Sequence, residues 1–291
     1  MGDISRVGVV GSGIMGAGIA EVCGRAGLDV LVSEVSEEAV RAGQDRVARS
    51  LRRAVHAGKL TPAGRDKALS AIRFTTDLAE FADRELVIEA ILEGADAKAG
   101  VLAALDTIAG RDAILASNTS SIPIMKLAMA TSRAPQVIGI HFFNPAPVLA
   151  LVELIPCLLT SEETCWRAEA FITATLGKTA IRCPDRAGFV VNALLIPYLL
   201  AAIRMLESGF AAAEDIDSGM VLGCGHPMGP LRLADLIGLD TVTAVARSMH
   251  EEFAEPPYAP PPLLLRMVDA GLLGRKTGRG FYDYTKPARE A

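Results

Sequence analysis

Near its start the chain reads Arg6-Val7-Gly8-Val9-Val10-Gly11-Ser12-Gly13-Ile14-Met15-Gly16, an apolar strand that runs into three spaced glycines. A helix is expected over residues 14–25 and a second apolar strand over residues 29–33. In this context Gly11 makes the tight turn, Gly13 leaves room for a pyrophosphate, and Gly16 lets helix and strand pack closely. The helix N-terminus offers unpaired N–H groups to phosphates. The pattern predicts a dinucleotide-binding βαβ unit.

An acidic residue, Glu34, follows the second strand, about 20 residues beyond the last glycine. A carboxylate there accepts hydrogen bonds from a ribose 2′-hydroxyl and repels a 2′-phosphate. Residues 35–38 bring no Arg or Lys to receive such a phosphate. We therefore predict NAD, in preference to NADP. The predicted cofactor-binding residues at this end are Gly11, Ser12, Gly13, Ile14, Met15, Gly16 and Glu34.

Composition narrows the class of protein. The 291 residues are 51% hydrophobic and 22% charged, and the net charge of -5 argues against nucleic acid as the main partner. The longest apolar stretch, residues 189–203, contains polar and proline residues and is too short to span a membrane. The five cysteines form no C-x-x-C pair, the four histidines have no metal-ligand spacing, and no signal segment precedes the first strand. We expect a cytoplasmic protein without a metal.

The organisation of the chain changes near residue 185. Before it, probable strands alternate with helices; after it, helical periodicity prevails over residues 189–207, 213–223, 230–252 and 262–270. The expected strands are residues 6–10, 29–33, 86–90, 113–117, 136–140, 149–155 and 179–183. A helical hairpin over residues 37–71 turns at Gly58 and restarts at Thr61-Pro62. We predict an α/β fold: a Rossmann-like dinucleotide-binding domain (1–185) with an inserted helical hairpin, then an all-α domain (186–291).

His141 and Glu153 are the best-placed candidates for acid–base chemistry. His141 follows the strand over residues 136–140, and His141 and Glu153 flank the turn at Ala146–Pro147, with Pro147 midway between them. If the flanking strands pair as a hairpin, the two side chains lie opposite each other, with Cβ atoms ~5 Å apart. A buried carboxylate would orient the imidazole as a general base for a hydroxyl proton. A satisfied core histidine with a solvent-facing Glu153 is an equally weighted alternative.

Other polar residues leave two interpretations open. Ser117 stands at a strand end and could bind a substrate oxygen, whereas Ser120 or Ser121 is expected to cap the next helix. Asn192 interrupts an apolar helix and needs a partner, either another helix or a ligand. The first hairpin helix carries Arg46, Arg49, Arg52 and Arg53, which form a solvated face or a docking surface for an anion.

Taken together, these segments resemble the short-chain L-3-hydroxyacyl-CoA dehydrogenase family, most closely its bacterial 3-hydroxybutyryl-CoA dehydrogenases. The matching motifs span nearly the whole chain. They are GSGIMG (11–16), VIEAILE (87–93), ASNTSSIPI (116–124), GIHFFNPAPVLALVELI (139–155), DRAGFVVNALLIPYL (185–199), HPMGPLRLADLIGLD (226–240) and GRKTGRGFYDY (274–284).

The resemblance implies roles for the residues that match. His141 would be the catalytic base, oriented by Glu153, while Ser117 and Asn192 would bind the 3-oxygen of the substrate and its neighbourhood. Glu93, Lys98, Ser117 and Asn144 would approach the cofactor, and Ser50 would contact CoA. Ala193 and Ala57 stand where the family often carries Arg and Lys, which affects how the CoA phosphates are bound.

The implied activity is NAD-dependent oxidation of a short-chain L-3-hydroxyacyl-CoA, such as 3-hydroxybutyryl-CoA, to the 3-ketoacyl-CoA, and the reverse, in fatty acid or butanoate metabolism. The family also implies a homodimer formed through the helical domain. Alternatives are the same chemistry on acyl carrier protein, hydroxyadipyl-CoA or a free sugar acid, and a non-catalytic nucleotide-binding protein. Retention of His141, Glu153, Ser117 and Asn192 together argues against the last, since maintaining the fold requires none of them.

Overall fold

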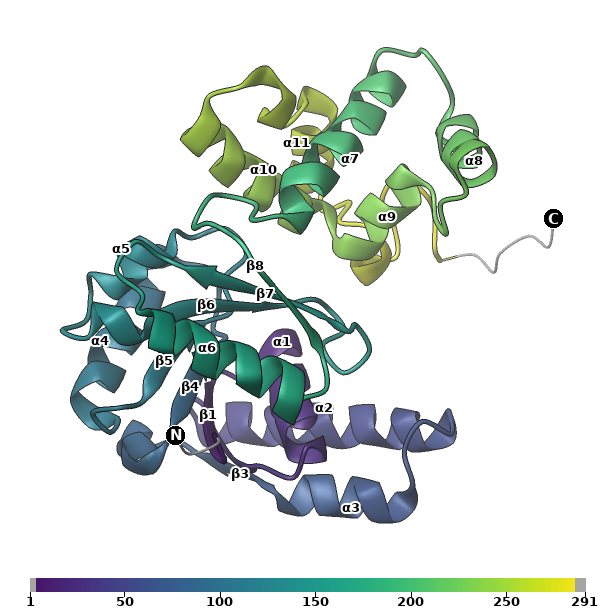
Figure 1. Cartoon of the computed structure of the whole chain (residues 1–291). Helices are drawn as coiled ribbons and strands as arrows, with labels where there is room; N and C mark the ends of the chain where they lie inside the picture. The colour runs from purple at the N-terminus through teal and green to yellow at the C-terminus, as the bar shows by residue number, and fades with distance from the viewer. Residues whose placement is uncertain (1–3, 286–291) are drawn as a thin grey trace. The chain divides into compact units, whose positions relative to one another are not determined.

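The computed structural model describes residues 4–285. The chain divides into two compact units, Met1–Arg186 and Ala187–Ala291, so the division falls one residue after the predicted boundary. The first unit is built on a sheet and the second is helical (Figure 1).

An eight-stranded sheet forms the first unit, in the order β3-β2-β1-β4-β5-β6-β7-β8. Neighbouring strands are parallel except β6 and β7, which form an antiparallel pair. The order reverses beside β1, and the crevice at such a point, beyond the carboxyl ends of the strands, is where α/β sheets bind dinucleotides. The predicted Rossmann-like class is thereby confirmed. The strands are β1 (Arg6–Val10), β2 (Asp29–Ser33), β3 (Ile72–Thr75), β4 (Leu86–Glu89), β5 (Ile114–Ser117), β6 (Val137–Phe142), β7 (Leu151–Pro156) and β8 (Thr179–Arg182).

Helices cover both faces of this sheet (Figure 1). One face packs on α1, the hairpin helices α2 and α3, and α6 in a single apolar core. The other packs on η1, α4 and α5, so closely that a Cβ on Gly8 would lie 2.4 Å from the Phe81 ring. The bounds are α1 (Ile14–Arg25), α2 (Glu37–His56), α3 (Pro62–Ser70), η1 (Leu78–Asp83), α4 (Ala95–Ile108), α5 (Ile124–Ala128), η2 (Ala134–Gln136), α6 (Glu162–Ala170) and η3 (Phe171–Thr175).

Two elements differ from the prediction. The strand β3 was not expected, because its four residues follow α3 directly and pair with β2 only in the folded sheet. The single helix expected over residues 230–252 is two helices, since Gly238 adopts a φ of +105° and breaks the helical path. The predicted start of α3 is correct: Thr61 Oγ1 accepts a hydrogen bond from Gly64 N at 3.0 Å, and Pro62 is the first helical residue.

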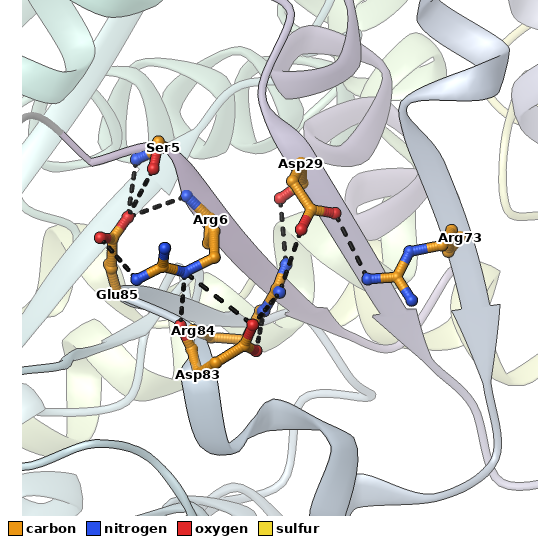
Figure 2. A network of polar contacts seen from close by, with 7 residues as sticks. All are labelled: Ser5, Arg6, Asp29, Arg73, Asp83, Arg84 and Glu85. Carbon is orange, nitrogen blue, oxygen red and sulfur yellow. Dashed lines mark hydrogen bonds and ion pairs between the residues drawn. The ribbon is translucent and has the colours of Figure 1, made fainter.

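A charge network joins the amino ends of the parallel strands (Figure 2). Arg84 is buried and donates to both oxygens of Asp83, at 2.8 Å each, and to Asp29 Oδ2 at 3.1 Å. Beside it, Glu85 accepts from Ser5 N and Arg6 N, at 2.8 and 2.9 Å. Burial raises the pKa of Asp29, but its bonds to arginine lower it by more, and the pKa stays below its usual value. The network locks the start of β1, β2 and β4 together.

Besides its apolar core, the second unit contains a buried carboxylate, that of Asp235. It accepts hydrogen bonds from Phe281 N and Tyr282 N, at 3.0 Å each, in the segment after α11. A Cβ on Gly280 would lie 2.0 Å from Asp235 Oδ1, so the GRKTGRGFYDY segment needs its glycine there. The elements are α7 (Val191–Glu207), α8 (Ala213–Cys224), α9 (Pro230–Ile237), α10 (Leu239–Phe253), η4 (Pro256–Tyr258), α11 (Pro262–Asp269) and η5 (Arg275–Thr277).

The described residues, 4–285, contain neither a membrane-spanning helix nor a cluster of metal ligands. No helix in this part of the chain is long and apolar enough to cross a membrane. Within the same residues, no group of three or more His, Cys, Asp or Glu side chains is placed to hold a metal ion. All cysteines are free thiols, and Cys224 is the exposed one.

Candidate active site

In the loop between β1 and α1, two glycines are needed for the backbone to pack as it does, and a third is not. Gly11 has a φ of +91°, and a Cβ there would lie 2.9 Å from the Ala90 carbonyl oxygen. A Cβ on Gly16 would lie 1.9 Å from the Gly11 carbonyl oxygen. By contrast, a Cβ on Gly13 would meet no atom within 4 Å beyond its own chain neighbours, in the part of the chain described. The absence of a side chain at Gly13 therefore leaves space at the N-terminus of α1, which is the geometry that a bound phosphate would need.

Glu34 follows β2 directly and contacts this loop. Its Oε1 accepts hydrogen bonds from Ser12 N at 2.5 Å and Ser12 Oγ at 2.7 Å. Arg46 of α2 donates to the Ser12 carbonyl oxygen. A ribose at Glu34 and a pyrophosphate at the loop would thus belong to one dinucleotide. The preference for NAD rests on the absence of Arg and Lys in residues 35–38, which do not include Arg46. Only the packing of α2 brings this cation to the loop.

His141 and Glu153 face each other across β6 and β7, which pair as an antiparallel hairpin, one of the two alternatives that the sequence left open. The His141 Nδ1 atom lies 2.8 Å from Glu153 Oε2, and both side chains are buried. Strand β6 continues through Phe142, so His141 lies within the strand instead of just beyond it. Because a carboxylate oxygen accepts, Nδ1 carries the proton and Nε2 keeps the lone pair. The pair can therefore act as an oriented base whose protonated form is stabilised by Glu153.

The ends of β4 and β5 carry a buried carboxylate and a buried hydroxyl, Glu89 and Ser117, which are paired in register. Ser117 Oγ donates to Glu89 Oε2 at 2.6 Å. Glu89 Oε1 accepts from Lys98 Nζ and from Ile91 N, at 2.7 Å each. Lys98 reaches the pair from α4 and is only 1% exposed. Because unpaired buried charges are costly, each charge in this cluster depends on the others.

Glu93 extends this cluster toward the loop after β5. Its Oε2 lies 3.2 Å from Lys98 Nζ, and its Oε1 accepts from Thr119 Oγ1 at 2.5 Å and Ser121 Oγ at 3.0 Å. Partial burial raises the pKa of Glu93, but Lys98 and the hydroxyl donors lower it by more, and the net shift is downward. Glu93 thus remains an anion beside the strand ends.

The expected helix cap at Ser120 or Ser121 is wrong. Both residues bond Glu93 through Ser120 N and Ser121 Oγ. The first N–H groups of α5 instead donate to the Asp185 carboxylate, from Ile124 at 2.8 Å and Met125 at 2.7 Å. A residue distant in sequence therefore does the capping, which local pattern cannot foresee.

Strand register gathers these groups on one face of the sheet. Ser117 of β5 pairs with Gly139 of β6, and His141 lies two residues beyond Gly139 in β6. The side chains of Ser117 and His141 therefore lie on the same face of the sheet. Asn118 Oδ1 accepts a hydrogen bond from Phe142 N at 2.8 Å and ties the ends of β5 and β6 together. The sequence prediction missed both Asn118 and Glu89. The only signal for Glu89 was a polar residue inside an apolar run, and the only signal for Asn118 was its place beside Ser117 at a strand end.

Three further predicted site residues, Asn144, Ser50 and Asn192, come from a loop and two helices. Asn144 is exposed in the turn after β6, and Ser50 is half-buried on α2. Within residues 4–285, neither forms a hydrogen bond with the clusters above. A hollow on the exposed side of α2 is lined by Arg49, Arg52, Arg53 and His56. Asn192 lies in the first turn of α7, in the second unit.

Comparison with known proteins follows the same division of the chain. The family model described as "3-hydroxyacyl-CoA dehydrogenase, NAD binding domain" matches residues 6–186, and the model for the C-terminal domain of that family matches residues 188–284. A 3-hydroxybutyryl-CoA dehydrogenase of Mycobacterium tuberculosis is 59% identical over 282 residues, covering 97% of this chain and 99% of the relative.

Solved structures agree with the sequence comparison. The FadB2 protein of M. tuberculosis is 58% identical with a TM-score of 0.96, over 97% of this chain and 100% of that one. The (S)-3-hydroxybutyryl-CoA dehydrogenase PaaH1 of Ralstonia eutropha is 49% identical with a TM-score of 0.92, over 98% and 100% of the two chains. The chain therefore belongs to the 3-hydroxyacyl-CoA dehydrogenase family, and its first unit is that family's NAD-binding domain.

Proposed function

We propose that this chain oxidises L-3-hydroxyacyl-CoA esters, with 3-hydroxybutyryl-CoA as the main substrate, and catalyses the reverse reduction. The observation that carries the proposal is the buried pair of His141 Nδ1 and Glu153 Oε2, 2.8 Å apart, in the same sheet as β1, the strand that leads into the glycine loop. Family membership and the names of the similar proteins support this choice of substrate.

In the proposed mechanism, Nε2 of His141 takes the proton of the 3-hydroxyl group as C3 is oxidised. Bound NAD supplies the acceptor for the C3 hydride. Glu153 stabilises the imidazolium that forms, and in the reverse direction the same nitrogen returns the proton to the 3-oxygen. Because Glu153 is fully buried, water screens the attraction between its carboxylate and the imidazolium only weakly.

The residues proposed to hold NAD are the loop residues 11–16 with Glu34 at one end of the sheet edge, and Glu93, Lys98, Ser117 and Asn144 further along it. Ser117 and Asn192 remain predicted contacts of the substrate, and Ser50 of its CoA moiety. The arginines around the hollow on α2 supply positive charge beside Ser50, where Ala57 replaces the lysine often found in the family. The homodimer and the cytoplasmic location also remain predictions.

The decisive test measures the reduction of acetoacetyl-CoA by the loss of absorbance of the reduced nicotinamide, first with NADH and then with NADPH. We expect rapid turnover with NADH, far slower turnover with NADPH, and lower kcat/KM as the acyl chain lengthens. Acetoacetate without CoA, a 3-oxoadipyl-CoA and an acetoacetyl-acyl carrier protein serve as comparison substrates. A higher kcat/KM with any of these would replace the proposed substrate, and no turnover with any would contradict the proposed activity.

A further inference from the structure

The hydrogen bonds around Glu89 determine which way the Ser117 hydroxyl points. Every partner of Glu89 in residues 4–285 is a donor: Ser117 Oγ on Oε2, and Lys98 Nζ and Ile91 N on Oε1. Thr119 N donates to Ser117 Oγ at 3.3 Å. A serine hydroxyl has one proton and two lone pairs. The proton of Ser117 is therefore committed to Glu89, and one lone pair remains for a bound ligand.

We propose that Glu89 is a positioning residue that fixes Ser117 as a hydrogen-bond acceptor toward the bound cofactor. This inference deepens the proposed function, on which its choice of ligand rests. A 3-keto oxygen has only lone pairs, and a 3-hydroxyl group gives its single proton to His141, so neither can donate to Ser117. The nicotinamide carboxamide and the ribose hydroxyls of NAD are donors. Of the two contacts predicted for Ser117, with the cofactor and with the substrate, this polarity favours the contact with an N–H or O–H of the cofactor.

The geometry of Glu89 makes Glu89→Gln a specific reversal of this polarity. Oε1 receives two donors, Lys98 Nζ and Ile91 N, so the amide oxygen of the substituted side chain takes that place. The amide N–H₂ then occupies the place of Oε2 and donates to Ser117. The serine proton turns toward the cofactor, where it meets another donor. Lys98 keeps its ion pair with Glu93 at 3.2 Å, which favours a folded variant.

A matched control lies at the other end of β4. Glu85 also accepts from a serine hydroxyl, a backbone N–H group and a cation: Ser5 Oγ at 3.0 Å, Arg6 N at 2.9 Å and Arg6 Nη2 at 2.9 Å (Figure 2). It precedes the strand, whereas Glu89 ends it. Glu85→Gln makes the same chemical change at the amino end, and we expect it to lower the melting temperature slightly and leave cofactor binding unchanged.

The experiment measures the Kd of NADH by fluorescence, without acyl substrate, for the full-length wild type, Glu89→Gln, Ser117→Ala, their double variant and Glu85→Gln. We expect Glu89→Gln to weaken binding about tenfold, because two donors face each other. Ser117→Ala should weaken it by less, and the double variant should bind as Ser117→Ala does. Removing the hydroxyl therefore rescues Glu89→Gln, which a merely structural role would not predict. Thermal melting of each variant checks the fold.

A second cofactor identifies the donor. Reduced 3-acetylpyridine adenine dinucleotide carries a methyl ketone in place of the carboxamide and keeps its ribose hydroxyls. If Glu89→Gln weakens NADH but not this analogue, the donor is the carboxamide. Equal weakening of both assigns it to a ribose hydroxyl. Either result supports an acceptor at Ser117.

The proposal is wrong if Glu89→Gln binds NADH as Glu85→Gln does, or if the effects of Glu89→Gln and Ser117→Ala multiply in the double variant. If Glu89→Gln fails to fold, a double variant that also carries Lys98→Met removes both members of the buried charge pair. Its Kd for NADH is then compared with that of Lys98→Met alone. A wild type that does not reduce acetoacetyl-CoA would disprove the proposed function. The NADH-binding assay contains no acyl substrate, so it would still test the polarity of Ser117.

Discussion

The two ends of β4 hold similar groups in different circumstances. Before the strand, Glu85 is surrounded by donors from β1 and its lead-in, and its neighbours Asp29 and Asp83 are 43% and 60% exposed. At its end, Glu89 is fully buried, as is the Ser117 hydroxyl that it binds. Both carboxylates are satisfied by a serine, a backbone N–H group and a cation.

The difference lies in what remains after each network is satisfied. Around Glu85 the donors and acceptors pair with one another, so that end stabilises the sheet. Around Glu89 the hydroxyl of Ser117 keeps a lone pair, and α1 begins without a side-chain cap, so its first N–H groups have no partner within the helix. This end is therefore suited to bind a ligand. Substitutions at the carboxyl end should therefore change turnover or cofactor binding, and those at the amino end should change stability alone.

The largest expected effect is at the carboxyl end. His141→Gln removes the proposed base, and turnover of acetoacetyl-CoA with NADH should fall ~10²–10⁴-fold, the usual contribution of a general base. The Kd of NADH should stay within twofold of the wild type, by fluorescence titration. Turnover near the wild-type rate in a folded variant would show that His141 is not the base. It would also contradict the assignment of catalysis to the carboxyl end of the sheet.

Glu153→Gln should have the next largest effect. The amide keeps the shape of the side chain but cannot stabilise an imidazolium at His141, 2.8 Å away in the wild type. Loss of such a supporting partner should cost about 10- to 100-fold in kcat. The matched substitution Glu85→Gln, measured in the same assay, should leave kcat unchanged. Equal losses of kcat in the two variants would mean that both ends of the sheet serve catalysis.

At the amino end, Arg84→Ala should reduce stability and spare catalysis. The Arg84 side chain is 2% exposed and binds Asp83 and Asp29 at 2.8 and 3.1 Å, so its loss removes buried packing and the shorter ion pair of each carboxylate. Within residues 4–285, Asp83 then keeps only Arg6, at 3.9 Å, and Asp29 keeps only Arg73, at 3.5 Å. The free energy of unfolding should fall by about 2 kcal/mol in urea denaturation, since exposed partners are partly compensated by water. The kcat and KM values should match the wild type at 25 °C, and a change in either would contradict the division between the two ends.

Sequence alone predicted those parts of the molecule whose signals are local. The glycine loop, the two strands around it and the cap at Thr61 depend on neighbouring residues, and each is found as expected. The pairing of β6 with β7 was one of two alternatives that the sequence left open, and the structure has the hairpin. The roles of these residues in catalysis stay predictions until the variants above are measured.

Contacts between distant segments were beyond the reach of the sequence pattern. Glu89 looks like one polar residue in an apolar strand, and its importance depends on Lys98 arriving from α4 and Ser117 from β5. Likewise, Arg46 reaches the glycine loop only because α2 packs there, and Asp185 caps α5 from the far end of the unit. In each case the hydrogen-bond partner is specified by tertiary packing, which leaves no periodic trace in the sequence.

The smallest expected effect is the pH dependence carried by Glu85. Partial burial raises its pKa, but the N–H groups of Ser5 and Arg6 lower it by more, so the folded-state pKa lies below the ordinary 4.5. A lowered pKa adds stability that is complete above the unfolded-state pKa and is lost as the pH falls through the folded-state value. Glu85→Gln should therefore be less stable than the wild type at pH 7, by about 1 kcal/mol or less.

That gap in unfolding free energy should close as the pH falls from 5 toward 3, because the wild type loses the contribution that the variant already lacks. Urea denaturation of both proteins at pH 7, 5, 4 and 3 measures it. Asp29 and Asp83 titrate in both proteins and cancel in the difference. A gap that stays constant over this range would mean that the charge of Glu85 contributes nothing. The amino end would then be held by packing and by Arg84 alone, and its likeness to the Glu89 cluster would be one of shape without electrostatics.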